Sequence, residues 1–515
     1  MCRRLATERA RAHERVMGKR QLLNVLPNFA GVGAGFVFTL LFNAAYYRLL
    51  GSEGYGLVGF YGTLAVLASL LDPRLSQTTL REVARLSGDP ARADELAALV
   101  LTFASISCGP GLLVGMLAVA FSQWLATSWL GSSQLSIGEI ATAIAMMGGI
   151  LAFIFPTSIF NAVLRGLQLQ VLSNTVAIVA GASRGVGTIA ALYLFGSTPL
   201  VFFSAQLLIS ALEVAVMGGL AWWALPRSSN GARFDFRLFQ TRWRFTLTIW
   251  LSDLIGQLIM LSDRIVMSTL LPLDLFGLYS LAFAVASTVQ RLVVPFSNAY
   301  LPHFVELLEK GHRDLLSEAY HLVTRISSAV VLCAGLLLMV YAKPIMMLLT
   351  GDAASTEMVA PVFALLAAAN MLASLVVLPK ALQFACGAAW IAFRISLIEA
   401  LPYLALLLLL APRFGMYAPA GLWLAASAIN LPIITIMTHR VALRGQAWAW
   451  FRQAVLLPAG GAVAALALGA VMMPERSMRV FLLPWLALNY GVALVIALLC
   501  AFRGRFPRRQ NPDPG

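Results

Sequence analysis

Long apolar runs recur along the whole sequence, and they constrain its fold more than any short motif does. An α-helix needs roughly 20 apolar residues to cross the hydrocarbon core of a membrane. We expect spanning helices near residues 22–47, 55–71, 96–121, 137–160, 171–195, 200–225, 245–269, 275–300, 326–349, 359–379, 391–411, 417–438, 453–473 and 480–502. The sequence therefore predicts an all-α polytopic membrane protein with about 14 transmembrane helices.

The composition supports this prediction and excludes several classes of protein. Hydrophobic residues make up 60% of the 515 residues, and charged residues only 12%. Soluble globular domains are nearer half apolar and a quarter charged, so a water-soluble enzyme, a disordered protein and a disulfide scaffold are all excluded. The five cysteines show no CxxC spacing, and the sequence has no HExxH motif or Cys/His cluster. We therefore expect neither a metal site nor another cofactor.

The distribution of lysine and arginine over the loops tests the number of spans. With the N-terminus in the cytoplasm, the inward-facing segments hold 29 of the 37 basic residues and the outer loops hold 5. Basic residues favour the cytoplasmic side, and one span more or fewer would reverse every later loop. We therefore expect both termini in the cytoplasm. The net charge of +14 then faces anionic membrane lipid, and we expect no nucleic-acid partner.

A short internal repeat suggests how the spans are grouped. Residues 49–57 (LLGSEGYGL) and 270–278 (LLPLDLFGL) share four identical positions at an offset of 221, and each stretch joins the first two spans of a block. Two like halves are typical of alternating-access transporters. We expect a basic tail at 1–21, an N-lobe of six helices at 22–225, a linker at 226–244, a C-lobe of six helices at 245–438, an extra helix pair at 453–502 and a tail at 503–515.

Polar side chains interrupt five of the expected spans. An ionisable residue within a span costs ~2.5–3.5 kcal/mol on the insertion scale, so each is a functional candidate. Residues three or four positions apart share one face of a helix. The predicted faces are Asp253, Gln257, Met260 and Arg264, with Asp263 beside them; Ala177, Gly181, Arg184 and Thr188; Gln206, Ser210 and Glu213; Ser280, Ala284, Ser287 and Arg291; and Asn24, Asn28, Gly31 and Gly35.

Two interpretations of these faces stay open. In the first, they line a polar cavity that both lobes share. In the second, the charges pair within the bundle and only brace it, Arg184 with Glu213 or Arg264 with Asp263. Small residues on the same faces would also permit close contact between helices.

Two stretches resemble a known family. The residues RLLGSEGYGLVGFYGTL (48–64) and SDRIVMSTLLPLDLFGLYSLAFAVAS (262–287) are similar to the repeat signatures of Wzx-type oligosaccharide flippases, polysaccharide exporters of the multidrug/oligosaccharidyl-lipid/polysaccharide (MOP) superfamily. The resemblance implies two six-helix lobes in a V shape, with the extra helix pair offering a groove for a lipid tail. It also implies translocation of undecaprenyl-diphosphate-linked oligosaccharide between the leaflets of a bacterial inner membrane, for O-antigen, exopolysaccharide or capsule assembly.

The resemblance also implies partners and roles for particular residues. The substrate is a lipid-linked oligosaccharide, the partners are a polysaccharide polymerase and a chain-length regulator, and the protein acts as a monomer. A diphosphate needs cationic partners in a setting of low dielectric. We expect substrate binding by Arg264, Arg184, Arg291, Gln257 and Asn28, with Arg48 at the outer mouth, and ion coupling by Asp253, Asp263 or Glu213.

Three other functions fit the sequence less well than this one. Multidrug antiporters of the superfamily, coupled to cations or protons, typically have twelve spans. Lipid II flippases usually carry a Ser-Arg and an Arg-Asp pair in the first span, and residues 28–42 (NFAGVGAGFVFTLLF) have neither. A membrane glycosyltransferase or polymerase needs a large charged outer loop, and the longest outer loop expected here, 122–136, has no charge. We therefore expect a transporter and no enzyme.

Overall fold

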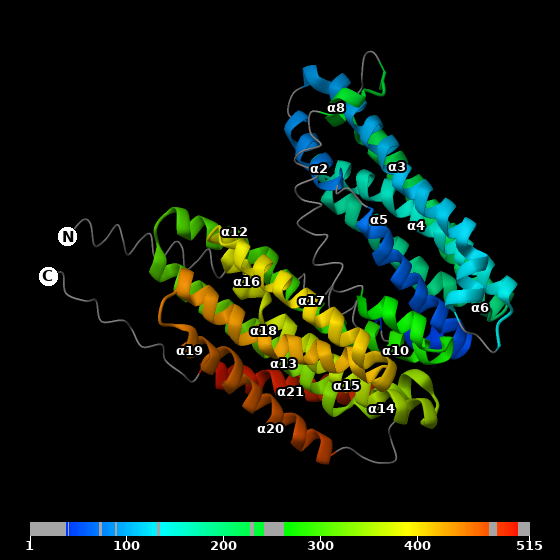
Figure 1. Cartoon of the computed structure of the whole chain (residues 1–515). Coiled ribbons are helices and arrows are strands. Elements are labelled where there is room, and N and C mark those ends of the chain that lie inside the picture. Colours follow the sequence, from blue (N-terminus) through cyan, green and yellow to red (C-terminus); the bar gives the residue numbers. More distant parts are fainter. Residues whose placement is uncertain are drawn as a thin grey trace. The chain divides into compact units, whose positions relative to one another are not determined.

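The structure is a computed structural model that describes residues 38–39, 41–71, 75–87, 90–130, 134–226, 231–240, 262–472 and 482–502. All regular secondary structure in these ranges is helical (Figure 1). The chain divides into two compact units. The N-unit comprises Phe42–Leu281 and Leu407–Gly415, and the C-unit comprises the rest of the chain.

Within the described ranges, 11 helices are long and apolar enough to cross a membrane. The number is 12 if the helix Leu41–Leu70 and α2 (Leu75–Leu86), which meet at 57°, form one bent span. The expected spans near 22–47 and 245–269 lie mostly outside the described residues. The prediction of an all-helical, multi-pass membrane protein is confirmed, while the total of fourteen spans stays a prediction.

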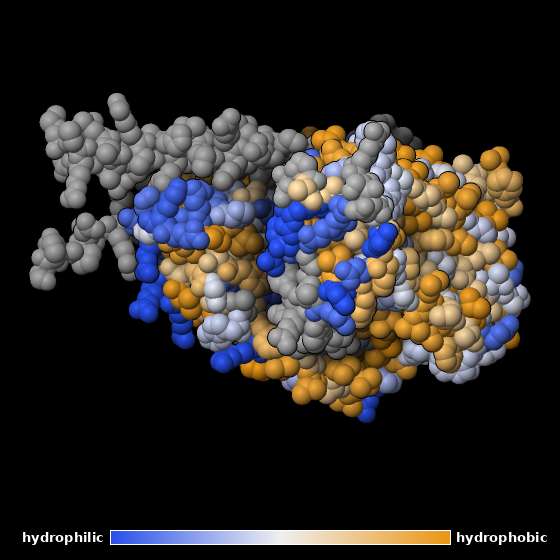
Figure 2. All heavy atoms as spheres, turned by 90° about the horizontal axis from the view of Figure 1, so that it is seen from above, coloured by the Kyte–Doolittle hydropathy of each residue, from blue (hydrophilic) through white to orange (hydrophobic). Residues whose placement is uncertain are grey.

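The outer faces of the helices fit a lipid environment. Large apolar side chains are exposed on both units, among them Val171 (82%), Leu401 (77%) and Val471 (85%). Figure 2 shows hydrophobic residues covering broad areas of the visible face, with hydrophilic residues gathered in smaller patches. In water such large apolar areas would mark interaction sites or cause aggregation, whereas in a bilayer they face lipid tails.

The N-unit is built around α4, which packs against α2, α3 and α7. A serine begins α4 with a capping box: Ser136 Oγ accepts from the Glu139 backbone N (3.2 Å), and the Glu139 carboxylate accepts from the Ser136 N (3.0 Å). This arrangement satisfies backbone donors that a helix start leaves unbonded. After the helix Leu41–Leu70, the α-helices of the unit are α2, α3 (Ala93–Trp124), α4 (Ile137–Gly166), α5 (Gln170–Ala182), α6 (Thr188–Phe195), α7 (Pro199–Ala224) and α8 (Phe236–Gln240).

The C-unit is built around α13, which packs against α12, α15, α20 and α21. Beside the start of α19, Ser317 Oγ and the buried His321 Nε2 both bond to Gln446 Oε1 at 2.7 Å. The helices are α10 (Leu273–Ala286), which begins in the N-unit, α11 (Thr288–Arg291), α12 (Val294–Glu309), α13 (Arg313–Val340), α14 (Ala342–Thr350), α15 (Ala353–Leu375), α16 (Val377–Ala385), α17 (Ala389–Phe414), which ends in the N-unit, α18 (Tyr417–Ala442), α19 (Ala447–Trp450), α20 (Leu457–Val471) and α21 (Leu482–Phe502).

The two stretches of the internal repeat meet within the N-unit. A Cβ atom added at Gly56 would overlap the backbone oxygen of Leu273, and one added at Gly277 would overlap the backbone oxygen of Ser52. Leu273 and Gly277 follow Ser52 and Gly56 by the repeat offset of 221 residues. The same contact therefore occurs twice with its roles exchanged, as it does across a two-fold axis.

We expect the Gly56→Ala variant to lose about 1–3 kcal/mol of unfolding free energy, because the added methyl group forces two backbones apart. Gly181→Ala is the matched control, since Gly181 is helical and has nothing within 4 Å of an added Cβ; alanine there should be neutral or stabilising by up to about 1 kcal/mol. Denaturant unfolding of the purified protein in detergent measures both. A Gly56→Ala variant as stable as the control would contradict the close contact.

Candidate substrate cavity in the N-unit

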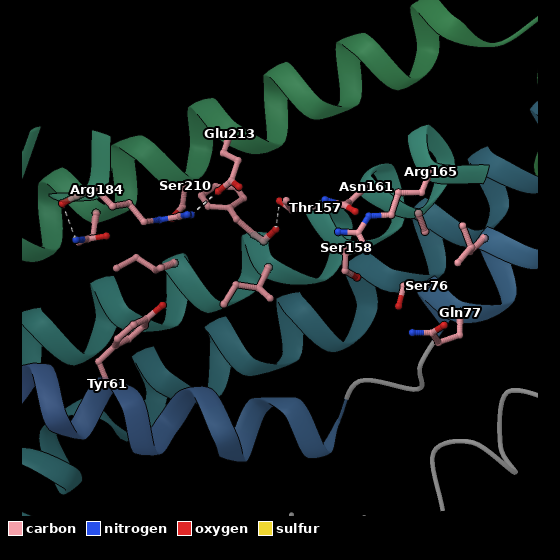
Figure 3. Close-up of a pocket in the computed structure, with 16 residues that line it drawn as sticks. Tyr61, Ser76, Gln77, Thr157, Ser158, Asn161, Arg165, Arg184, Ser210 and Glu213 are labelled. Atoms are coloured by element: carbon pink, nitrogen blue, oxygen red, sulfur yellow. Dashed lines mark hydrogen bonds and ion pairs between the residues drawn. The ribbon is translucent and has the colours of Figure 1, made fainter. Parts of the chain in front are cut away.

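The N-unit encloses a cavity of about 630 Å³ whose walls come from the helix Leu41–Leu70, α2, α4, α7 and the segment between α5 and α6 (Figure 3). This volume is in the usual range of small-molecule sites. Apolar side chains form part of the wall. The polar side chains of the lining are Tyr61, Ser76, Gln77, Thr157, Ser158, Asn161, Arg165, Arg184, Gln206, Ser210 and Glu213.

An ion pair between Arg184 and Glu213 forms part of the cavity wall. Arg184 Nη2 contacts Glu213 Oε2 and also donates to Ser210 Oγ at 3.3 Å. The Arg184 side chain is 34% exposed and the Glu213 side chain 11% exposed. The expected pairing of these residues is therefore present, but the arginine remains partly open to the cavity and is not sealed in a dry bundle.

Arg165 is a second cation of the cavity, although it lies beyond the expected span 137–160. Helix α4 continues to Gly166, so Arg165 lies in its last turn. Figure 3 shows Arg165 beside Asn161 and Ser158. The spacing of Thr157, Asn161 and Arg165 at intervals of four residues places them on one helix face, and this signal would have revealed the site. With Arg184 and Glu213, the lining carries one net positive charge.

Arg184 does not belong to a regular α-helix. It lies in a five-residue π-turn, Ser183–Gly187, which separates α5 from α6. The predicted helical face is interrupted at this turn: Ala177 and Gly181, before it, are exposed, whereas Thr188, after it, is buried. A π-turn inserts one extra residue into the helix and shifts the faces on its two sides relative to each other.

Arg264 and Asp263 lie elsewhere in the N-unit and do not line this cavity. The Arg264 guanidinium donates to the backbone oxygen of Gly62 at 3.3 Å. Asp263 is buried and accepts a hydrogen bond from the Arg264 backbone N at 2.9 Å and from the Tyr279 hydroxyl at 3.5 Å. Their roles in binding and ion coupling stay predictions.

The remaining candidates are not brought to this cavity. Arg48 is exposed on the helix Leu41–Leu70, and Arg291 is exposed at the end of α11 in the C-unit. Asn28, Asp253 and Gln257 lie outside the described residues. A cavity shared by arginines of both lobes therefore also stays a prediction.

A scan against protein-family models matched the sequence to the polysaccharide biosynthesis protein family over residues 22–308, more than half of the chain. The comparison with curated proteins gave no match.

Several solved structures share the fold. The lipid II flippase MurJ in an inward closed conformation is 11% identical, with a TM-score of 0.68 over 92% of this chain and 98% of the flippase. An inward-facing multidrug resistance MATE transporter of the MOP superfamily is 15% identical, with a TM-score of 0.65 over 81% and 96%. A MOP superfamily transporter from Pyrococcus furiosus is 16% identical, with a TM-score of 0.53 over 83% and 95%. The chain thus has the fold of MOP superfamily transporters.

We expect the cavity to contain water. In a background with all five native cysteines replaced by alanine, the Asn161→Cys variant should react with a charged, membrane-impermeant thiol reagent about tenfold faster than Leu208→Cys, because the reactive thiolate forms in water. Leu208 is the control: it is 62% exposed, but on an apolar surface that we assign to lipid. Reaction rates are followed by mass spectrometry, and equal rates at the two positions would contradict a water-filled cavity.

Proposed function

Because the chain belongs to the polysaccharide biosynthesis protein family, we propose that it moves undecaprenyl-diphosphate-linked oligosaccharide from the cytoplasmic to the periplasmic leaflet of a bacterial inner membrane by alternating access. The observation that carries the proposal is the pair of arginines, Arg165 and Arg184, on the wall of a polar cavity within a transporter fold. The product would serve O-antigen, exopolysaccharide or capsule assembly. No enzyme activity is proposed.

The diphosphate is the part of this cargo that cannot cross hydrocarbon without help. Guanidinium groups bind phosphate oxygens through paired, charge-assisted hydrogen bonds, which are about twice as strong as neutral ones. The low dielectric of the surrounding helices strengthens such contacts further. Arg184 and Arg165 would bind the diphosphate, while the amides and hydroxyls of Asn161, Gln206 and Ser210 would bind sugar hydroxyls.

Glu213 is the group that cargo phosphate would replace as the partner of Arg184 in this binding step. In the absence of cargo its carboxylate holds Arg184 in the wall. Cargo phosphate that takes over the guanidinium would leave the Glu213 carboxylate free to pair with another cation. Glu213 is therefore our candidate for ion coupling. The membrane potential would also help, because outward movement of an anion is favoured by ~2.3 kcal/mol per charge per 100 mV.

A cation- or proton-coupled antiporter is the second candidate, and the Glu213 carboxylate in the cavity favours it, since this group can bind a cationic drug. A lipid II flippase is a related alternative, because it would meet the same diphosphate with a different sugar. A polysaccharide polymerase and a chain-length regulator are proposed as partners, and a monomer as the working form.

We expect Arg184→Gln and Arg165→Gln each to slow transport of the lipid-linked diphosphate sugar by about 10–100-fold, the effect of losing one charge-assisted hydrogen bond. Arg413→Gln is the control, since Arg413 is exposed at the end of α17 and away from the cavity. The assay follows fluorescent lipid-linked sugars in reconstituted vesicles, with a lipid II arm and a cationic-dye arm. Transport of the dye but not of the lipid-linked sugars would replace the proposal with the antiporter.

A further inference from the structure

Tyr46 lies where the helix Leu41–Leu70 packs against the π-turn that carries Arg184. Its hydroxyl donates a hydrogen bond to the backbone oxygen of Arg184 at 2.7 Å and lies 3.4 Å from the backbone oxygen of Gly185. The Tyr46 side chain is buried, with 8% of its surface exposed. A carbonyl at a π-turn lies where the regular i to i+4 bonding pattern is interrupted, so this hydroxyl supplies a bond at the point of interruption.

The packing around Tyr46 fixes the position of its hydroxyl. Its ring meets Phe202 edge to face, with 5.0 Å between the ring centroids. A Cβ atom at Gly185 would overlap the ring of Phe42, one turn before Tyr46. The absence of a side chain at Gly185 therefore leaves room for the Phe42 ring against the π-turn.

A second side chain supports the same turn from α7. Gln206 Nε2 lies 3.5 Å from the Arg184 backbone oxygen and donates to Thr188 Oγ1 at 3.2 Å. Tyr46 and Gln206 thus hold the π-turn from two different helices. Gln206 also lines the cavity, whereas Tyr46 does not.

We propose that Tyr46 is a positioning residue: through its hydrogen bond to the Arg184 backbone, it keeps the π-turn in place and so keeps the Arg184 guanidinium on the cavity wall. If the turn relaxed to regular α-helix, the helical register would shift by one residue. This shift would rotate Arg184 by about 100° relative to α6. The task of the guanidinium rests on the proposed function, but its orientation does not.

The first test measures orientation without transport. In the cysteine-free background, the Arg184→Cys variant is labelled with the charged thiol reagent, with and without Tyr46→Phe, which removes the hydroxyl and keeps the ring. We expect Tyr46→Phe to slow labelling about fivefold, the effect of losing one buried hydrogen bond. Labelling of Asn161→Cys should stay unchanged, as should labelling of Arg184→Cys with Tyr193→Phe, a hydroxyl loss on the same span at a side chain 73% exposed.

An unchanged rate at position 184 would overturn the proposal. An equal fall at positions 184 and 161 would also overturn it, because the hydroxyl would then support the whole cavity and not the turn.

The second test uses the transport assay. We expect Tyr46→Phe to raise the KM for the lipid-linked diphosphate sugar about fivefold with little change in the maximal rate. In an Arg184→Gln background the same change should have no further effect, because Tyr46 acts through Arg184. Additive losses would overturn the proposal. If the wild-type protein carries no such sugar, the proposed function fails, while the labelling result still decides the role of Tyr46.

Discussion

The absence of water from a bilayer core requires every backbone amide and carbonyl to find its partner within the chain. Regular helices meet this requirement, and the described residues are helical almost throughout. Departures from regular helix are costly there and call for local compensation. The described chain has three π-turns, Leu125–Trp129, Ser183–Gly187 and Phe451–Leu456. The second carries the cavity arginine, and side chains from two neighbouring helices donate to the backbone oxygen of Arg184.

The same constraint governs charged side chains. A lone guanidinium within a span costs several kcal/mol, and a nearby carboxylate lowers this cost by mutual neutralisation. The Arg184–Glu213 pair therefore lets a permanent cation stay at the cavity wall when no cargo is bound. In the proposed binding step an anion would replace Glu213 as the negative partner of Arg184, so the guanidinium would stay compensated throughout.

The sequence predicts features that depend on length and composition, and it fails where local geometry decides. Apolar length located most of the described helices, because membrane thickness fixes how many residues a span needs, but the loop expected between residues 47 and 55 lies within the helix Leu41–Leu70. Charge complementarity anticipated the pairing of Arg184 with Glu213. Helical periodicity could not predict the change of register between Arg184 and Thr188, because it assumes a constant rotation per residue and a π-turn alters it. Arg165 was missed because a charged residue ends an apolar run, although its helix continues. The function of Tyr46 could not be predicted, since its partner is a backbone atom 138 positions away.

The reciprocal contact between Gly56 and Gly277 has a mechanical consequence. The repeat relates its two halves, so the two backbones approach each other closely at two equivalent positions, Gly56 and Gly277. Because both close approaches join the same two segments, a shift of one segment along the other changes both approaches together. Gene duplication would have created both sides of this contact from a single ancestral segment.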